Sequence, residues 1–360
     1  MIKIALIGCT GSIGRQVCDV VRSHPERFEF SALVCRENSE ALAKLKEEFR
    51  PAISYCSAQG EREDVFDGCD VAFIAVSGFS GLAYTLRAAR AGKIIALANK
   101  ESLVCGGELV TSEAEKHGAT LVPVDSEHSA IFQALAFQRD ATFSKLVLTA
   151  SGGPFLHCTK EELKTVTPKE ALQHPTYKMG AKISIDSATL LNKGYEVIEA
   201  KWLYGADFSE IEVIVHPESI VHSLVYFKDG AAIAQLAYPD MRIPIQLALT
   251  YPERDECAPA LDLAKIGALH FLRLEEEKFP CFTLALNAGR EGGTCPAILN
   301  AAAEVAVGAF LDERISFPEI AETIERTLNA ISRENADSYE KIKDADFHAR
   351  CYANKLIYGK

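Results

Sequence analysis

The sequence predicts an α/β protein in which a doubly wound parallel sheet is followed by an α+β domain with a lid loop and a C-terminal α-helical domain. Three observations support this fold class. Apolar runs of strand length alternate with helical patterns through residues 1–124, as in a parallel sheet with helices on both faces. The alternation stops after Ala150, where Ser151-Gly152-Gly153-Pro154 breaks the chain. From Phe282 onward the patterns are helical.

The first region begins with Ile2–Ile7, an apolar run interrupted only by Lys3, of the kind found in strands buried on both faces. Further strands are predicted at Phe30–Val34, Val71–Val76, Lys93–Ala98 and Ala119–Val124. Helices are predicted through Val17–Val21 and at Ala41–Phe49, Leu82–Ala91 and Glu108–His117. The second of these helices follows Asn38 and Ser39, which are typical helix-start residues.

In the second region, strands are predicted at Leu146–Thr149, Glu212–Val215, Ile220–Phe227 and Ala231–Tyr238, with a hairpin turn at Lys228-Asp229-Gly230. Helices are predicted at Ala297–Leu311, Phe317–Ala330 and Ser338–Leu356. We therefore expect four parts: a first domain at 1–124, a second at 125–254 with a lid near 172–183, a linker at 255–281 and a helical domain at 282–360.

Composition narrows the class of protein. The 360 residues carry a net charge of −12, so nucleic acid and anionic membranes are poor partners, and an anionic ligand needs local binding groups. The 11 cysteines are scattered without a C-x-x-C pair, which is typical of buried thiols in a reducing compartment. No run of 18 apolar residues occurs, so we expect no transmembrane helix. The expected location is cytoplasmic.

A glycine-rich turn, Gly8-Cys9-Thr10-Gly11-Ser12-Ile13-Gly14, joins the first strand to the first helix. In a Rossmann-like βαβ unit this turn lets the pyrophosphate of a dinucleotide rest on the helix N-terminus. The spacing is G-x-x-G-x-x-G rather than the commoner G-x-G-x-x-G. The alternative is a tight turn that binds no ligand.

The end of the second predicted strand indicates which dinucleotide would bind. NAD enzymes usually carry an acidic residue there, whereas this chain has Arg36, followed by Glu37 and Asn38. An arginine can form charge-assisted hydrogen bonds with a 2′-phosphate, so NADP is favoured. The neighbouring Glu37 could bind a ribose hydroxyl instead, and Arg36 could be a solvated loop charge.

Acidic residues in two segments suggest a metal site. Asp125 and Glu127 follow a predicted strand and face the same side if the chain is extended, where they could bind Mg²⁺ or Mn²⁺. Alternatively, Asp125 caps a helix. In the second segment, Asn192, Lys193 and Glu196 share one helical face, which could equally be solvated. Gly194 costs that helix about 1 kcal/mol relative to Ala, which suggests a close approach there.

Serines, glycines and histidines complete the set of candidate residues. Ser151 is followed by Gly152 and Gly153, whose N–H groups could bind an anion. Four histidines lie next to turn residues, and any one of them alone is more often structural than chemical: His128, His174, His216 and His222.

Taken in order, these motifs resemble one enzyme family over about residues 1–330. They include Gly8–Gly14, Ala98–Ser102, Asp125–His128, Ser151–Phe155, His174-Pro175, Lys182–Ser184, Asp186–Thr189, Asn192–Gly194, Glu196, His216-Pro217, Ser219, His222-Ser223 and Pro239–Arg242. The chain is similar to 1-deoxy-D-xylulose 5-phosphate reductoisomerases. The resemblance implies that a ketose phosphate is rearranged by cleavage and re-formation of a C–C bond. NADPH then reduces the resulting aldehyde to 2-C-methyl-D-erythritol 4-phosphate, an isoprenoid precursor.

The resemblance also implies site residues and partners. The implied metal ligands, for Mg²⁺, Mn²⁺ or Co²⁺, are Asp125, Glu127 and Glu196. The implied substrate-binding residues are Lys100, Ser126, Glu127, Ser151, His174, Ser187, Asn192, Lys193 and Glu196, of which Lys100 and the three carboxylates are expected to be catalytic. The implied cofactor contacts are Thr10, Gly11, Ser12, Ile13, Arg36, Asn38, Asn99, Glu101 and Gly180. His128 and His222 are expected to support the site, and the family implies a homodimer.

Three positions depart from the family pattern. Cys9 replaces the more frequent Ser, Asn300-Ala301-Ala302-Ala303-Glu304 lacks an Asn before the Glu, and Tyr177 stands in the lid where many relatives have Trp.

Two other functions remain open. A different NADP oxidoreductase would catalyse its reaction without a metal ion and on a substrate that carries no phosphate. A non-catalytic NADP sensor would bind the nucleotide but catalyse no reaction.

Overall fold

A computed structural model describes residues 1–136, 143–177 and 179–359. The chain forms two compact units. The first contains Met1–Ser102, Val110–Phe132 and Asp240–Ala260, and the second contains Leu103–Leu109, Gln133–Pro239 and Leu261–Lys360. The segment from Asp240 to Ala260 thus belongs with the N-terminal sheet, although the sequence suggested a place in the second domain and linker. Lys178, inside the predicted lid, lies outside the described residues.

The first unit is built on a six-stranded parallel sheet with the order β3-β2-β1-β4-β5-β6. Its strands are β1 (Ile2–Ile7), β2 (Phe28–Cys35), β3 (Ile53–Cys56), β4 (Val71–Ile74), β5 (Ile94–Leu97) and β6 (Thr120–Pro123). The strand order reverses between β1 and β4, and ligands of such sheets bind beyond the carboxyl ends of the strands at this point. The predicted doubly wound sheet is confirmed. The short edge strand β3 was not predicted.

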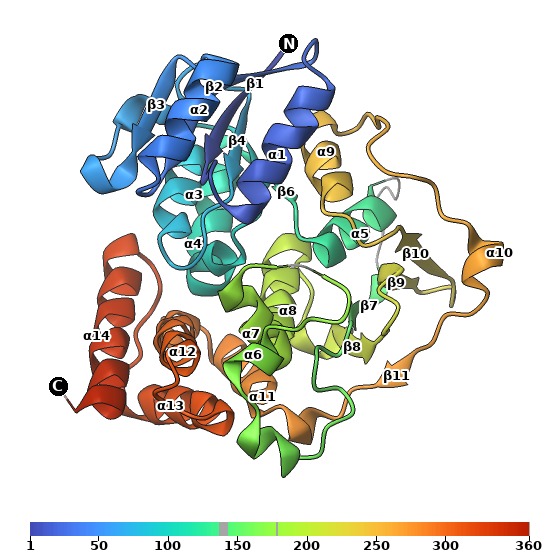
Figure 1. Cartoon of the computed structure of the whole chain (residues 1–360), viewed down its shortest axis with the longest axis vertical. Coiled ribbons are helices and arrows are strands. Elements are labelled where there is room, and N and C mark those ends of the chain that lie inside the picture. Colours follow the sequence, from blue (N-terminus) through green and yellow to red (C-terminus); the bar gives the residue numbers. More distant parts are fainter. Residues whose placement is uncertain (137–142, 178, 360) are drawn as a thin grey trace. The chain divides into compact units, whose positions relative to one another are not determined.

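Helices connect these strands and complete the core of the first unit. They are α1 (Ser12–Ser23), α2 (Ser39–Phe49), α3 (Gly81–Arg90), α4 (Lys100–His117), α5 (Ser126–Leu135) and α9 (Arg242–Thr250). The last of these, α9, lies beside α1 (Figure 1) and buries Ile245 and Leu249 in the same core as Ile4 and Leu6. The sequence did not reveal α9, because its packing partners, which include α1 and β6, lie more than 100 positions earlier in the chain.

The second unit contains a five-stranded mixed sheet with the order β10-β9-β7-β8-β11. Its strands are β7 (Phe143–Ala150), β8 (Ile211–Val215), β9 (Val221–Phe227), β10 (Ala232–Leu236) and β11 (Leu272–Arg273). Strand β7 runs parallel to β8 and antiparallel to β9. The predicted hairpin between β9 and β10 is confirmed by their antiparallel pairing.

Two helices of the second unit, α7 (Ala181–Ala188) and α8 (Leu191–Tyr204), are separated by Thr189 and Leu190, and Leu190 has a φ of 55°. Gly194 lies within α8 because a Cβ at this position would be 2.4 Å from the Cβ of Ala285. The close approach that the glycine suggested is therefore made by helix α11 (Pro280–Glu291). The remaining short helices of this unit are α6 (Pro168–Ala171) and α10 (Leu263–Ile266), with 3₁₀ turns at Glu162–Thr165, Phe208–Glu210 and Glu276–Lys278.

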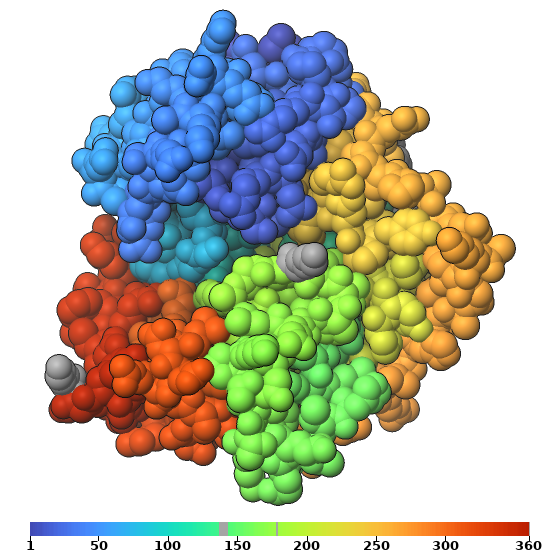
Figure 2. All heavy atoms as spheres, viewed as in Figure 1, coloured from blue at the N-terminus to red at the C-terminus, as the bar shows by residue number. Residues whose placement is uncertain are grey.

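The C-terminal part of the second unit is helical, as predicted. Helices α11, α12 (Cys295–Leu311), α13 (Phe317–Ala330) and α14 (Tyr339–Tyr358) pack against one another, and their outer surface is orange to red in Figure 2. Helix α12 is the centre of this group, because every residue from Cys295 to Ala303 is buried. The group supports α8 through α11, which packs along it.

Candidate active site

The glycine-rich turn after β1 is shaped by close backbone contacts. Gly8 has a φ of 95°, and a Cβ there would be 2.5 Å from the carbonyl oxygen of Ala75. A Cβ at Gly14 would be 2.2 Å from the carbonyl oxygen of Gly8. Both glycines are therefore required for the strand, turn and helix to pack closely, as in dinucleotide-binding turns.

Helix α1 begins at the end of this turn with Gly11 at the cap position. Gly11 has no side chain to accept hydrogen bonds from the first N–H groups of the helix, and the first turn of α1 contains no acidic residue. Gly11 and Ser12 are exposed, whereas Thr10 and Ile13 are half-buried. An exposed helix N-terminus of this kind favours a phosphate group.

The end of β2 carries the predicted adenosine contacts. Arg36 is 85% exposed, and its Nε lies 3.2 Å from a carboxylate oxygen of Glu37. Asn38 caps α2, since its side-chain oxygen accepts a hydrogen bond of 3.0 Å from the N–H of Ala41. Arg36 is thus accessible to a ligand, while Asn38 already has a structural role.

Asn99 joins the ends of two neighbouring strands. Its amide donates hydrogen bonds of 3.0 Å to the carbonyl oxygens of Val76 and Gly78, and of 2.9 Å to Glu101. Its side-chain oxygen accepts from the N–H of Ser102 at 3.0 Å and so caps α4. Asn99 and Glu101 are both buried, so in this structure they hold the loop after β4 against the start of α4.

The acidic segment after β6 is paired with a lysine. The ammonium of Lys100 lies 2.7 Å from a carboxylate oxygen of Asp125, and Lys100 is buried. The hydroxyl of Ser126 donates to Glu127 at 2.5 Å. The backbone carbonyl of Asp125 accepts from the N–H of Ser129 in the first turn of α5, while the Asp125 side chain is turned to Lys100.

The second acidic position, Glu196, is fully buried on α8. One carboxylate oxygen accepts from the amide of Asn192 at 2.7 Å, and the other lies 2.5 Å from the ammonium of Lys193. Lys193 also donates to the carbonyl oxygen of Thr149 at 2.6 Å, and only 5% of its side chain is exposed. The predicted shared helix face is confirmed, and the alternative of a solvated face is wrong.

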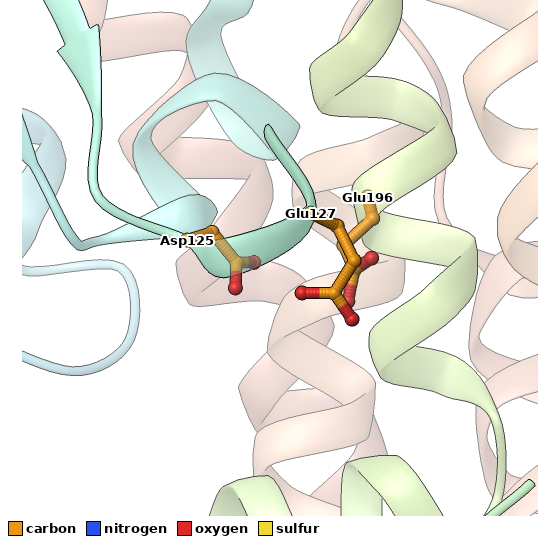
Figure 3. Close-up of side chains that lie close together, drawn as sticks. All are labelled: Asp125, Glu127 and Glu196. Carbon is orange, nitrogen blue, oxygen red and sulfur yellow. The ribbon is translucent and has the colours of Figure 1, made fainter. Parts of the chain in front are cut away.

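Asp125, Glu127 and Glu196 form a group suited to a cation. Each offers one carboxylate oxygen, and the three oxygens lie within 4.8 Å of one another. Figure 3 shows the three side chains together, with Asp125 and Glu127 on the segment at the start of α5 and Glu196 on α8. An all-oxygen set of three carboxylates matches hard cations such as Mg²⁺ and Mn²⁺.

A second polar group surrounds Ser151. The Nδ1 of His174 accepts from the backbone N–H groups of Thr176 at 3.2 Å and Tyr177 at 3.0 Å. The ring proton of neutral His174 is therefore on Nε2, which donates to the hydroxyl oxygen of Ser151 at 3.0 Å. The N–H of Gly153 donates to the same oxygen at 3.2 Å.

The turn at Ser151 also lies against the end of α7. A Cβ on Gly153 would be 3.0 Å from the carbonyl oxygen of Ser187, so the structure brings the predicted residues Ser151 and Ser187 into neighbouring backbone segments. Gly180, predicted to contact the cofactor, is an exposed N-cap of α7. Tyr177 is half-buried, with its ring centroid 5.6 Å from that of His174.

The sequence did not identify Thr149 as a contributor to this group. Its carbonyl oxygen accepts from Lys193, and its hydroxyl is 2.7–2.8 Å from the carbonyl oxygens of Val221 and His222. No sequence signal could have found it, because every residue has a carbonyl. His128 and His222 are buried, and their supporting roles stay a prediction.

Comparison with known proteins identifies the family. Models of 1-deoxy-D-xylulose 5-phosphate reductoisomerase match residues 4–68 and 55–107, a model of its C-terminal domain matches 121–204, and a DXP reductoisomerase C-terminal domain model matches 236–352. The chain belongs to this family. A 1-deoxy-D-xylulose 5-phosphate reductoisomerase of Geobacillus sp. is 48% identical, covering 98% of this chain and 99% of the relative. The Chlorobaculum tepidum enzyme is 46% identical, covering 99% and 100%.

Solved structures of the family agree with the fold. The Zymomonas mobilis reductoisomerase in complex with NADPH has a TM-score of 0.91 at 37% identity, with all of both chains covered. A reductoisomerase in complex with NADPH, fosmidomycin and magnesium has a TM-score of 0.90 at 38% identity, again with all of both chains covered. The fold class and the family predicted from the sequence are therefore confirmed.

Proposed function

We propose that this chain is an NADPH- and divalent-metal-dependent oxidoreductase that converts 1-deoxy-D-xylulose 5-phosphate to 2-C-methyl-D-erythritol 4-phosphate. The observation that carries the proposal is the group of three carboxylate oxygens within 4.8 Å, in a chain of this family. Relatives were solved with NADPH and magnesium. An NADP oxidoreductase that needs no metal, or a protein that only senses NADP, would leave the three carboxylates without a purpose.

Asp125, Glu127 and Glu196 would hold Mg²⁺ or Mn²⁺, and Co²⁺ is an acceptable substitute since it also accepts oxygen ligands. When bound, the cation acts as a Lewis acid and template for two substrate oxygens, and NADPH supplies the hydride. The two lysines beside these carboxylates set the local charge. Lys100 faces Asp125 and Lys193 faces Glu196, so part of the mutual repulsion of the acids is already offset.

The two lysines also orient the substrate in this proposal. Glu196 would be shared between the ammonium of Lys193 and the cation, and Lys193 would be shared between Glu196 and the substrate phosphate. With a cation at Glu196, Lys193 would be available to bind the phosphate. Lys100, together with Ser126 and Glu127, contacts the carbon backbone of the substrate, where it can donate hydrogen bonds but accept none.

The phosphate site that we propose consists of Ser151, Ser187, Asn192 and Lys193, with His174 beside it. The hydroxyl oxygen of Ser151 accepts from His174 and from Gly153, so its own proton is directed to a further acceptor such as a phosphate oxygen. Neutral donors and one buried cation bind a phosphate dianion without a general positive field, as the net charge of −12 requires. Tyr177, next to His174, lies on the proposed lid, which covers the substrate and excludes water.

The cofactor site that we propose uses the N-terminus of α1 for the pyrophosphate and the end of β2 for the 2′-phosphate. The residues concerned are Thr10, Gly11, Ser12, Ile13, Arg36, Asn38, Asn99, Glu101 and Gly180. Arg36 is the residue that selects NADPH over NADH, because its guanidinium is exposed at the end of β2.

The cellular setting is part of the same proposal. None of the helices in the described parts of the chain is long and apolar enough to cross a membrane. None of the 11 cysteines, which all lie within the described residues, forms a disulfide, and this supports a cytoplasmic location. We propose a homodimer on the strength of the family resemblance, and no nucleic-acid partner on the strength of the net charge.

Product analysis tests the proposed reaction. The purified chain is incubated with NADPH, Mg²⁺ and 1-deoxy-D-xylulose 5-phosphate, and the products are identified by NMR. We expect 2-C-methyl-D-erythritol 4-phosphate and NADP⁺ in equal amounts. NADPH oxidation with a different product, such as simple reduction of the ketone, would overturn the reductoisomerase assignment.

A further inference from the structure

Two cysteines next to the proposed cofactor site are aligned for a disulfide bond. Cys35 is the last residue of β2 and Cys56 is the last residue of β3, and the two are register partners in the parallel pair. Their Sγ atoms are 3.3 Å apart. Neighbouring strands are about 4.8 Å apart, which lies within the range of Cα separations that disulfides span. We propose that Cys35 and Cys56 form a reversible disulfide that weakens binding of the dinucleotide.

The bond requires only a small movement. A disulfide has an S–S distance of about 2.05 Å, so the two sulfur atoms must approach by roughly 1.2 Å from their separation of 3.3 Å. Hydrogen peroxide is a sufficient oxidant. One thiol reacts with it to give a sulfenic acid and water, and the second thiol displaces a further water to form the S–S bond. Two thiols thus lose two electrons and two protons while the peroxide is reduced to two waters.

The link to the cofactor site is structural. The thiol of Cys35 donates to the carbonyl oxygen of Asn38 at 3.5 Å, and the N–H of Ala58 donates to the carbonyl oxygen of Arg36 at 3.1 Å. The first hydrogen bond joins Cys35 to the segment that follows Arg36. The second joins Arg36 itself to the 3₁₀ turn Ser57–Gln59, which begins directly after Cys56. A disulfide removes the first bond outright, because the sulfur of Cys35 then carries no proton to donate to the carbonyl oxygen of Asn38. The effect on the cofactor rests on the proposed function, whereas formation of the bond does not.

The environment makes this pair slow to react. Cys35 and Cys56 are 2% and 5% exposed, and burial, followed by the adjacent Cys56, raises the pKa of the Cys35 thiol to about 12. Since the thiolate is the reactive form, the pair responds to sustained oxidation and has no role in each turnover. Cys9 is the third thiol nearby, because Cys35 contributes to the raised pKa of Cys9, so the test must distinguish the three residues.

Peptide mapping makes that distinction. Trypsin places Cys9, Cys35 and Cys56 in separate peptides, 4–15, 28–36 and 47–62. After treatment of the full chain with hydrogen peroxide and blocking of free thiols, we expect peptides 28–36 and 47–62 to be cross-linked, and a thiol reductant to separate them. The dissociation constant for NADPH, measured by fluorescence titration, should rise by about two- to tenfold, as the loss of one neutral hydrogen bond implies, and should recover after reduction.

Two variants and one ligand control complete the experiment. Cys56→Ser and Cys56→Ala should bind NADPH as the unmodified chain does and keep that affinity after peroxide. Cys69→Ser, which changes a buried thiol that donates to Phe66, should stay as sensitive as the unmodified chain. Bound NADPH should slow the cross-link, because coupling between the two events is reciprocal. Absence of the cross-link, or a cross-link that leaves the dissociation constant unchanged, overturns the proposal. Failure of the reduced chain to bind NADPH instead contradicts the proposed function.

Discussion

The two candidate phosphate-binding regions of this molecule are built in different ways. The turn from Gly8 to Gly14 offers backbone N–H groups at an exposed helix end, and a Cβ on Gly8 or Gly14 would lie less than 3 Å from backbone atoms. The region around Lys193 relies on buried side chains, with Glu196 fully buried and Lys193 in contact with both Glu196 and Thr149. A phosphate site made of backbone N–H groups tolerates substitution of the side chains at its surface. The buried charges of Lys193 and Glu196, in contrast, stabilise each other, so that removing one leaves the other without its partner. Single substitutions should therefore have much larger effects in the second region.

The largest effect is expected for Glu196→Gln. Glutamine removes the negative charge of the buried ligand while preserving its size. Replacing a residue that hydrogen-bonds to a metal ligand typically lowers metal affinity or activity by about 10- to 100-fold. Replacing the ligand itself should therefore lower kcat/KM by at least about 100-fold. NADPH oxidation at saturating Mg²⁺ measures the effect, and thermal unfolding checks that the fold survives. Glu212→Gln, at an exposed position on β8, is the matched control. A Glu196→Gln enzyme with half the original activity would remove Glu196 from the site.

Lys193→Met should affect both substrate binding and stability. The KM for the phosphorylated substrate should rise by roughly 10- to 150-fold, since a hydrogen bond to a charged group contributes about 1.5–3 kcal/mol. Without metal, the variant should also be less stable by about 3–5 kcal/mol, because the buried Glu196 carboxylate loses its cation. Added Mg²⁺ should therefore raise the unfolding temperature more in the variant than in the original chain.

The control for this prediction is Lys201→Met on the same helix, where the lysine contacts the rings of Trp202 and Phe208. We expect its KM to be unchanged. If Lys193→Met also leaves KM unchanged, the phosphate is bound elsewhere.

Tyr177→Ala tests the lid. The Tyr177 ring packs at 5.6 Å from the ring of His174, and its loss should lower kcat/KM by at least about tenfold, or 1.4 kcal/mol of transition-state stabilisation. Tyr177→Trp should retain most of the activity. Bound NADPH with a phosphonate substrate analogue should protect this segment from proteolysis. Unchanged kinetics in Tyr177→Ala, together with unchanged cleavage, would place the lid elsewhere.

The smallest effect is expected in the backbone-built region. Arg36→Ala should reduce the preference for NADPH over NADH by about tenfold, the lower end of the range for a charged hydrogen bond. The lower end applies because Arg36 is 85% exposed and must give up its contact with Glu37. Specificity constants for both cofactors measure the preference. Glu37→Gln should leave the preference intact, and equal use of NADH by the original chain would refute the assignment of Arg36.

The same contrast explains what could be predicted from the sequence. The helix spacing of Asn192, Lys193 and Glu196 placed three side chains correctly, because i,i+3 and i,i+4 neighbours are determined locally. Apolar runs of strand length located five of the six strands of the first sheet. By contrast, β3 is a four-residue edge strand, ISYC, with little apolar signal. The packing of α9 on α1 and of α11 on Gly194 depends on long-range contacts, which no local pattern encodes.

The most direct test of the account is an omission experiment that follows the nicotinamide absorbance of NADPH. The chain is mixed with NADPH, Mg²⁺ and 1-deoxy-D-xylulose 5-phosphate, and then Mg²⁺ is replaced by a chelator, or the substrate by its unphosphorylated sugar. We predict oxidation of NADPH only in the complete mixture, with activity restored when excess Mg²⁺ or Mn²⁺ is added to the chelated sample. Full activity in excess chelator, or equal use of the unphosphorylated sugar, would contradict the account.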